Sequence, residues 1–188
     1  TIYNDKLFFR ARPNSGRQML SIEPGGNITE IGILDVQELE VFRGDLLVLA
    51  ETNADKNDLY RFNDQTGNYD LLPNAFPGGE GVNAYGLLST PDRLYFPADP
   101  PEYDSEWYYY DGMNPAQLLY DVNKTTIGSS PFDFTPFQGK LYFSAENNIV
   151  NRETWVYDPT SGTTTLLEDL QPGLGDSQPF SYVVYNDR

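Results

Sequence analysis

Short runs of apolar and aromatic residues recur along the chain, and a charged residue leads each run. The runs start at Leu7, Leu46, Leu94 and Leu141, so the leucines are separated by 39, 48 and 47 residues. Turn-forming residues precede each of them, for example Asn4-Asp5 and Gln138-Gly139. Aromatic and aliphatic runs bounded by turn formers predict β-strands.

A second run ends in a polar residue at a nearly constant distance from each leucine. The polar residue follows the leucine by 16 positions in the first copy and by 17 in the other three. The four polar residues are Glu23, Asn63, Asp111 and Asp158. Two markers that keep the same offset in four copies indicate an internal repeat.

Two further apolar elements complete each unit. One contains Ile31 or a leucine pair (71–72, 118–119, 166–167), and the other lies at 39–42, 85–88, 132–134 and 180–184. Four short strands in a unit of about 47 residues predict an all-β fold, a four-bladed β-propeller with four antiparallel strands per blade. A solenoid of stacked units is the alternative, but its usual helical units or shorter repeats of about 20–34 residues are not visible.

The repeat also predicts how the chain is organised. We expect one domain over 1–188, with repeat units at about 1–41, 42–88, 89–135 and 136–188. Residues 180–184 could complete the first blade, whose own version of that strand is a stub at 1–3. The chain begins and ends at nearly the same position of the repeat. The same match is also expected of one segment of a longer repeat array.

Composition excludes several classes of protein. The chain has 188 residues, of which 12 are basic and 28 acidic, so its formal net charge is −16. It has no histidine and no cysteine, which excludes Ser-His-Asp and Cys-His catalysis, disulfides and thiolate metal sites. The acidic charge predicts that it does not bind nucleic acid. Its longest purely apolar run, 46–50, is too short for membrane insertion as a helix.

The second run resembles the signature of the ELWxxDGT repeat family of large secreted or surface proteins of bacteria. The clearest copy is Glu153-Thr154-Trp155-Val156-Tyr157-Asp158-Pro159-Thr160, and the third unit has Glu106-Trp107-Tyr108-Tyr109-Tyr110-Asp111-Gly112. The resemblance implies a β-propeller-like fold and an extracellular or cell-surface location. It carries no catalytic residues to this chain.

The repeated polar residues have two interpretations. Glu23, Asn63, Asp111 and Asp158 could supply oxygen ligands to Ca²⁺, which prefers such ligands. They could instead cap the turns that follow their strands, as Asp and Asn side chains commonly do. Glu106 and Glu153 stand five positions before an Asp, so strand geometry places them on the opposite face from it. No cofactor is required under either interpretation.

Aromatic residues at the same strands are candidates for ligand binding. Tyr60, Tyr108, Tyr110 and Trp155 could stack on sugars, although alternate residues of each strand must face the core. We therefore expect an extracellular binding or structural module for adhesion or surface assembly, with other proteins or surface glycans as partners and with calcium stabilisation. A lectin-like carbohydrate-binding propeller is the first alternative. A carboxylate-based hydrolase, which needs no histidine, is the second, but we expect the protein not to be an enzyme.

Overall fold

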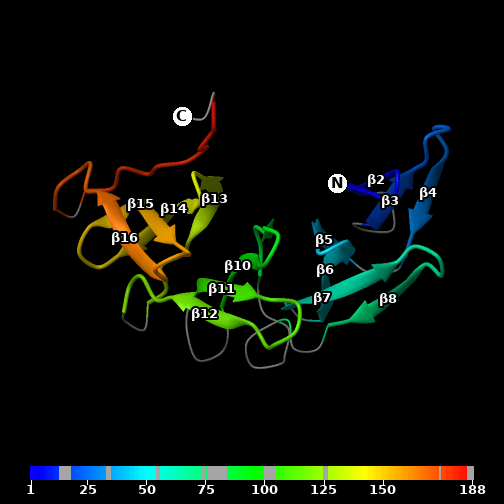
Figure 1. Cartoon of the computed structure of the whole chain (residues 1–188), viewed down its shortest axis with the longest axis horizontal. Coiled ribbons are helices and arrows are strands. Elements are labelled where there is room, and N and C mark those ends of the chain that lie inside the picture. Colours follow the sequence, from blue (N-terminus) through cyan, green and yellow to red (C-terminus); the bar gives the residue numbers. More distant parts are fainter. Residues whose placement is uncertain are drawn as a thin grey trace. The chain divides into compact units, whose positions relative to one another are not determined.

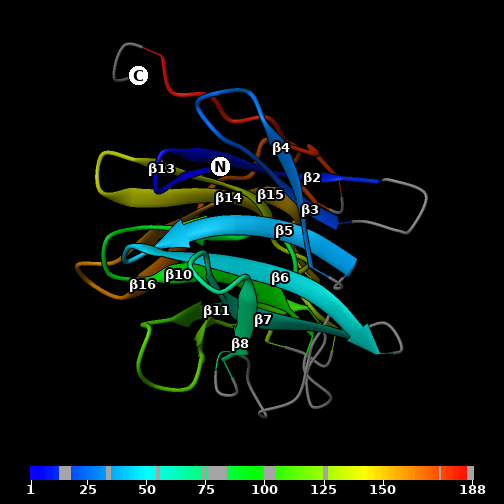
Figure 2. The same cartoon turned by 90° about the vertical axis from the view of Figure 1, so that its right-hand side faces the viewer.

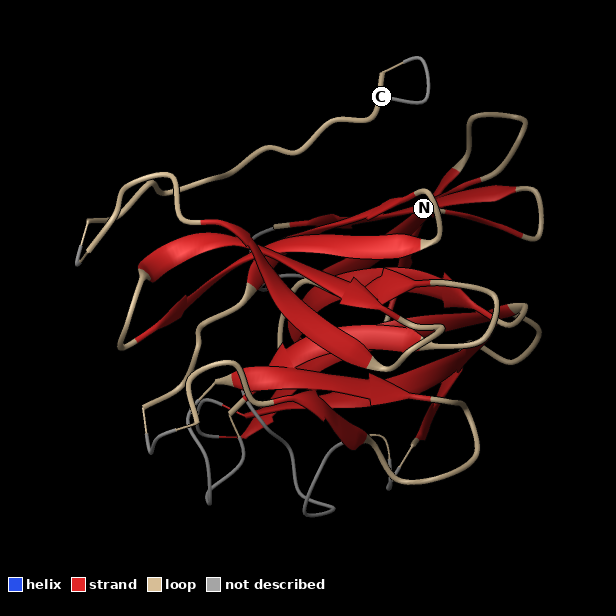
Figure 3. Cartoon of the chain, turned by 60° about the vertical axis from the view of Figure 1, so that its left-hand side comes forward, coloured by secondary structure: helices blue, strands red, loops and turns tan. Residues whose placement is uncertain are grey.

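The computed structural model describes residues 1–12, 18–32, 35–53, 56–72, 75, 84–99, 105–124, 127–173 and 175–185. Within these residues the regular structure consists of β-strands and contains no helix, as Figure 3 shows. Sixteen strands form four antiparallel sheets of four strands each, as the repeat predicts. Each sheet uses one continuous stretch of the chain and therefore one colour range in Figure 1.

The first two sheets follow one another along the N-terminal half of the chain. The first sheet has the order β1 (Ile2–Tyr3), β2 (Lys6–Ala11), β3 (Gln18–Ile22) and β4 (Ile28–Ile31). The second has the order β5 (Asp35–Phe42), β6 (Asp45–Asn53), β7 (Lys56–Asn63) and β8 (Asn68–Leu71).

The other two sheets repeat this arrangement. The third sheet has the order β9 (Leu88–Ser89), β10 (Leu94–Ala98), β11 (Glu106–Tyr110) and β12 (Gln117–Tyr120). The fourth has the order β13 (Phe132–Phe137), β14 (Lys140–Asn147), β15 (Asn151–Asp158) and β16 (Thr163–Glu168).

The second, third and fourth sheets each begin one strand earlier than the repeat units predicted from the sequence. The stretch at 39–42 belongs to β5, which pairs with β6 from Asp35↔Glu51 to Phe42↔Asp45; Figure 2 shows the two side by side. A tight turn at Arg43 and Gly44 joins them, with φ of 53° and 83°. Positive φ at both central residues is the type I′ geometry that matches the twist of a hairpin. The local hairpin therefore decides which strands share a sheet.

One predicted strand is not formed. Residues 180–184 correspond by repeat position to β5 and β13, yet they belong to no strand in the structure. A strand needs a neighbour to satisfy its backbone donors and acceptors. In the part of the chain that the structure describes, the segment pairs with no strand, and Ser181 has a φ of 60°, which lies outside the strand region. The predicted stub at the start of the chain is confirmed as β1, of two residues.

The chain divides into two compact units. One contains Thr1–Phe96 and Tyr109–Gln117, and the other contains Pro97–Tyr108 and Leu118–Arg188, so the division runs through the third sheet. The prediction of a single domain over 1–188 stays a prediction.

An apolar core joins the first two sheets within the first unit. Phe8 of β2 and Phe62 of β7 meet edge to face with ring centroids 5.8 Å apart, and Phe62 also contacts Tyr69 of β8. The buried residues of this cluster are Phe8, Met19, Val36, Leu46, Val48, Ala50 and Phe62. Leu46, Val48 and Ala50 alternate along β6, so they share the face of that strand that points into this cluster.

The core of the second unit is built around Trp107 of β11, which is fully buried. Its indole contacts Phe134 of β13, Phe143 of β14 and Tyr157 of β15. Trp107 is the third-unit residue that follows the glutamate of the repeated signature. The signature tryptophan here therefore packs against the next sheet.

Candidate functional site

The repeated polar residues lie where the third strand of each sheet ends. Asn63 Oδ1 accepts hydrogen bonds from the backbone N–H groups of Gln65 (3.1 Å) and Thr66 (3.2 Å). Asp158 Oδ1 accepts one from Thr160 N (2.9 Å), and Asp158 Oδ2 lies 3.3 Å from Lys140 Nζ. These are side-chain caps of tight turns.

Asp111 and Glu23 occupy the same place in their own sheets. Asp111 Oδ1 accepts from Met113 N (2.9 Å) and Asn114 N (2.7 Å), and its Oδ2 accepts from Asn114 Nδ2 (2.8 Å). These bonds, with those of Asn114 the strongest, lower the pKa of Asp111 to about 2. Glu23 Oε1 instead pairs with Lys6 Nζ at 3.5 Å.

Asn63, Asp111 and Asp158 therefore cap turns, which was one of their two interpretations, whereas the Glu23 side chain forms an ion pair with Lys6. Among the described residues, no group of three or more Asp, Glu, His or Cys side chains is arranged to hold a metal ion. Calcium binding at Glu23, Asn63, Asp111 and Asp158 stays a prediction.

Three of the four candidate stacking residues are buried. Tyr108, Tyr110 and Trp155 expose less than a tenth of their surface. Trp155 Nε1 donates to Ala145 O at 3.1 Å, which fixes the indole against β14. A sugar needs an exposed aromatic face to stack on, so the expectation that these three rings serve as surface platforms is corrected: each of them is buried within its own unit. Tyr60 is half-buried and meets Tyr69 edge to face.

A buried glutamate at the start of β11 accepts two hydrogen bonds from the loop before the next sheet, an arrangement called the clasp below. Glu106 is 3% exposed, and its Oε1 accepts from Ser129 N (2.8 Å) while its Oε2 accepts from Ser129 Oγ (2.7 Å). Burial raises the pKa of Glu106 to about 7, and the negative charge of Asp121 adds to the rise. The hydrogen bonds from Ser129 act in the opposite direction.

The fourth sheet repeats this clasp. Glu153, at the equivalent position, is fully buried, and its Oε2 accepts from Ser177 Oγ at 2.5 Å. Sequence reasoning placed both glutamates opposite the turn acids but missed these serines. The sequence does contain a signal for these pairs, because the spacing between glutamate and serine is nearly the same in both units. Ser129 follows Glu106 by 23 residues, and Ser177 follows Glu153 by 24.

The clasps leave little room for carboxylate chemistry. A hydrolase needs two carboxyl groups that face a substrate across a cleft. Both oxygens of Glu106 are bound to Ser129 beneath the surface, so this carboxylate is not presented to a substrate.

The most exposed apolar segment of the second unit follows the second clasp. Phe180, Val183 and Tyr185 are 71%, 79% and 74% exposed. The segment is tied to the fourth sheet by a hydrogen bond of 2.8 Å between Thr154 Oγ1 and the Tyr182 hydroxyl, and Ser181 N donates to the Asp133 carboxylate.

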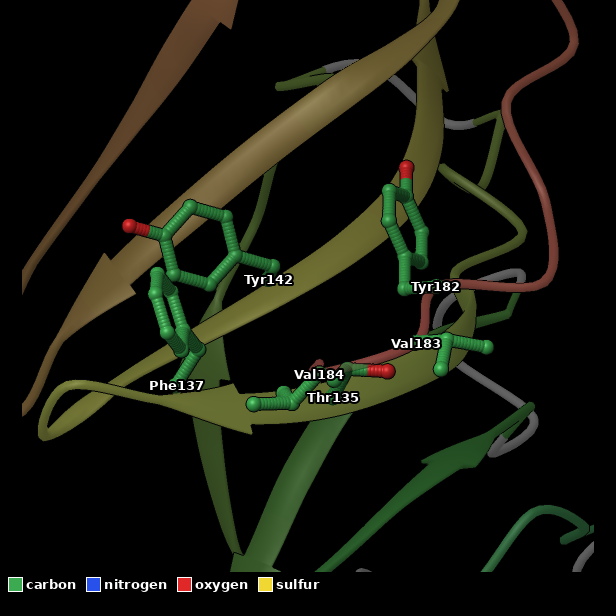
Figure 4. Close-up of a pocket in the computed structure, with 6 residues that line it drawn as sticks. All are labelled: Thr135, Phe137, Tyr142, Tyr182, Val183 and Val184. Atoms are coloured by element: carbon green, nitrogen blue, oxygen red, sulfur yellow. The ribbon is translucent and has the colours of Figure 1, made fainter. Parts of the chain in front are cut away.

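An apolar cavity lies between this segment and the hairpin of β13 and β14 (Figure 4). Its volume is about 140 Å³. Phe137 and Tyr142 meet on its hairpin side, with ring centroids 5.8 Å apart. The lining residues are Thr135, Phe137, Tyr142, Tyr182, Val183 and Val184. Together, the segment 180–185 and this cavity are called the C-terminal apolar site.

No protein-family model and no curated protein matches the sequence. Among solved structures, the chain is similar to TolB from Acinetobacter baumannii, with 15% identity, 87% of this chain and 40% of that chain covered, and a TM-score of 0.59. It is similar to the acylaminoacyl peptidase of Pyrococcus horikoshii, with 16% identity, 81% and 24% covered, and a TM-score of 0.57. A puromycin-hydrolyzing peptidase of Mycobacterium tuberculosis gives 16% identity, 89% and 30% covered, and a TM-score of 0.57.

These similarities concern the fold. The matched parts are β-propellers, and with the four antiparallel sheets they confirm the predicted all-β propeller fold. The chain spans between 24% and 40% of the length of these three proteins. The described residues include no helix long and apolar enough to cross a membrane.

Proposed function

We propose that the chain is a non-catalytic binding and structural module that mediates adhesion or assembly at a bacterial cell surface by contacting other proteins. The C-terminal apolar site carries this proposal. Keeping apolar surface in water costs roughly 25 cal/mol per Å², so contiguous exposed apolar residues usually mark an interaction surface. Phe180, Val183 and Tyr185 lie in one short segment and are each more than two thirds exposed.

The expected mode of contact is strand pairing. The segment 180–185 stands at the repeat position of β5 and β13, which form the first strands of their sheets. Hydrogen bonds to Thr154 and Asp133 hold the segment against the fourth sheet before any partner binds. We infer that it adds to the edge of a β-sheet in the partner, where backbone hydrogen bonds supply affinity and alternate side chains supply specificity.

Charge and sequence support the cell-surface part of the proposal. A net charge of −16 suits surroundings rich in cations, and the resemblance to the ELWxxDGT repeats points to secreted or surface proteins of bacteria. Calcium is then expected to stabilise the chain by reducing its self-repulsion. If the melting temperature is the same with calcium and with a chelator, that expectation is wrong.

The binding proposal is tested with the variant Val183→Glu, which places a charge in the C-terminal apolar site. Fluorescently labelled chain is added to intact cells of the bacterium that makes it, and bound label is measured by flow cytometry. We expect Val183→Glu to lose at least nine tenths of the binding. The matched control is Ile149→Glu, because Ile149 is 70% exposed in the same unit but lies in the turn between β14 and β15. Equal binding by wild type and Val183→Glu contradicts the proposal.

Carbohydrate binding is the second candidate, because aromatic side chains line the cavity. Phe137, Tyr142 and Tyr182 could offer ring faces to a sugar there. A glycan array separates the candidates: a saturable signal that Tyr142→Ala abolishes supports the lectin-like function. Silence on the array leaves protein contact as the function.

A further inference from the structure

A buried carboxylate oxygen in the fourth sheet lacks a hydrogen-bond partner. Glu153 is fully buried at the start of β15, and its Oε2 accepts from Ser177 Oγ (2.5 Å) and from Leu170 N (3.4 Å). Its Oε1 is also inaccessible to solvent and has no hydrogen-bond donor among the described residues. Burying a carboxylate oxygen without a donor or a counter-charge destabilises the folded state.

A second buried carboxylate oxygen, on the residue before Leu170, also lacks a hydrogen-bond donor. Asp169 directly precedes Leu170, whose N–H binds Glu153, so the backbone that carries Asp169 lies against the Glu153 carboxylate. Asp169 Oδ1 is buried and has no hydrogen-bond donor in the described part of the chain. Glu153 and Asp169 thus each carry a buried carboxylate oxygen without a donor, and the residue that follows Asp169 contacts the Glu153 carboxylate.

The third sheet provides an internal comparison. Glu106 and Asp121 are the equivalent residues there, 15 positions apart where Glu153 and Asp169 are 16 apart. Both oxygens of Glu106 accept hydrogen bonds from Ser129, and Asp121 Oδ1 accepts from Lys124 N at 2.5 Å. The same framework therefore satisfies its carboxylates with hydrogen-bond donors in one sheet and leaves two oxygens unmatched in the other.

The nearest basic side chain on the same strand is already engaged. Arg152 Nη2 lies 3.2 Å from Glu146 Oε2, and Arg152 Nη1 donates to Ser130 O at 3.0 Å. Arg152 is the basic residue of β15, so a cation from solution is the alternative source of positive charge beside Glu153. Carboxylate oxygens are hard ligands, which favours Ca²⁺, and Ca²⁺ accepts backbone carbonyls and water as its remaining ligands.

We propose that Glu153 and Asp169 bind one Ca²⁺ ion through Glu153 Oε1 and Asp169 Oδ1. The ion ties the start of β15 to the loop after β16 and so to Ser177, which leads into the segment 180–185. This site is distinct from the strand-end residues, and it is independent of whether the segment binds a partner protein.

The test uses the full chain freed of metal by chelation and titrated with CaCl₂ in a calorimeter. The wild type is expected to bind one Ca²⁺ with saturation, and Asp169→Asn to bind at least tenfold more weakly. Asp121→Asn is the matched control, since it makes the same change at the equivalent position of the third sheet, and Asp158→Asn is a control at a strand end. Both controls are expected to keep the wild-type affinity.

A second measurement distinguishes a loss of calcium binding from a loss of folding. Asp169 is only partly buried, so Asp169→Asn is expected to keep the wild-type circular dichroism, whereas Glu153→Gln changes a fully buried group. Calcium is expected to raise the melting temperature of the wild type and of Asp121→Asn but not that of Asp169→Asn. Absence of saturable binding by the wild type, or equal affinities of Asp169→Asn and Asp121→Asn, overturns the proposal.

Discussion

The indole of Trp107 lies flat on the ring of Phe134, with centroids 4.0 Å apart and planes 10° from parallel. Trp107 belongs to β11 and Phe134 to β13, so this contact joins neighbouring sheets inside the second unit. Trp107 also reaches Phe143 at 4.5 Å. Trp107 therefore contributes a large part of the aromatic core of the second unit.

Replacing Trp107 with Ala should therefore lower the free energy of unfolding by about 4 kcal/mol, because it removes the buried ring and leaves a cavity. Trp107→Phe should cost clearly less, since it keeps a ring on Phe134. Urea unfolding followed by circular dichroism measures both. Met113→Ala is the control, because Met113 is largely exposed, and a similar loss there would contradict the assignment of the core.

The raised pKa of Glu106 predicts that the free energy of unfolding falls as the pH rises. Burial raises its pKa from 4.5 to about 7 in the folded chain, so the folded state binds the proton more tightly than the unfolded state. Its stabilising contribution is complete below pH 4.5 and is lost as the pH rises through 7. The whole effect is roughly 3 kcal/mol.

The measurement is urea unfolding of wild type and Glu106→Gln at pH 5 and pH 8. The neutral amide cannot titrate, so the variant should lack this part of the pH dependence while keeping the general effect of the other acids. If wild type and variant lose the same stability between the two pH values, Glu106 does not carry the effect.

Gly32 and Tyr69 form a close contact that excludes a side chain at position 32. Tyr69 donates its hydroxyl hydrogen to Ile31 O at 3.1 Å, and a Cβ on Gly32 would overlap the Tyr69 hydroxyl. The φ of Gly32 is +86°, which is unfavourable for any other residue. Gly32→Ala should thus lower the free energy of unfolding by about 2 kcal/mol.

The Tyr69 ring supplies a second measurement on the same variant. Burial raises the pKa of Tyr69 to about 12. If the methyl group that Gly32→Ala adds displaces the ring toward solvent, an absorbance titration of tyrosine ionisation should show this pKa moving back toward 10. In a Tyr69→Ala background, the Gly32→Ala change should cost only the backbone strain; an unchanged cost would contradict the contact.

Variants of Asp111 distinguish between capping of the turn and binding of a metal ion by this side chain. Its hydrogen bonds to Asn114 and Met113 depress its pKa below the ordinary 3.8, so its stabilisation is present above pH 4 and is lost as the pH falls toward 2. Asp111→Ala should lower the melting temperature at pH 7, by less than Trp107→Ala does, and Asp111→Asn should retain most of the stability. The loss should be equal with calcium and with a chelator. A loss that appears only with calcium would favour a ligand role instead.

Much of the fold could be predicted because each strand pairs with the strand next to it along the chain. The spacing of Leu7, Leu46, Leu94 and Leu141 predicted four units, and these leucines lie in the second strands of the four sheets. The second, third and fourth sheets begin one strand earlier than predicted, because an apolar stretch alone does not show with which of its two neighbours it pairs. The turn at Arg43-Gly44 does say so, because positive φ at both central residues is the geometry of a two-residue hairpin.

The candidate site was less predictable because a strand pattern gives two faces and does not say what covers them. Tyr108, Tyr110 and Trp155 were candidates for exposed rings, and the neighbouring sheets and strands bury them. The clasps of Glu106 by Ser129 and of Glu153 by Ser177 join residues more than 20 positions apart across loops. Periodicity within a strand carries no information about such pairs, although comparison of the third and fourth units does.

The sequential strand order of all four sheets has a consequence for how the chain reaches its native state. Every pairing within a sheet joins strands that are neighbours along the chain, so closing each hairpin orders only a short loop. Low contact order of this kind favours rapid formation of each sheet, with no long-range pairing required first. We expect the sheets to form as separate folding nuclei, and the slow step to be the docking of one finished sheet on the next through rings such as Trp107.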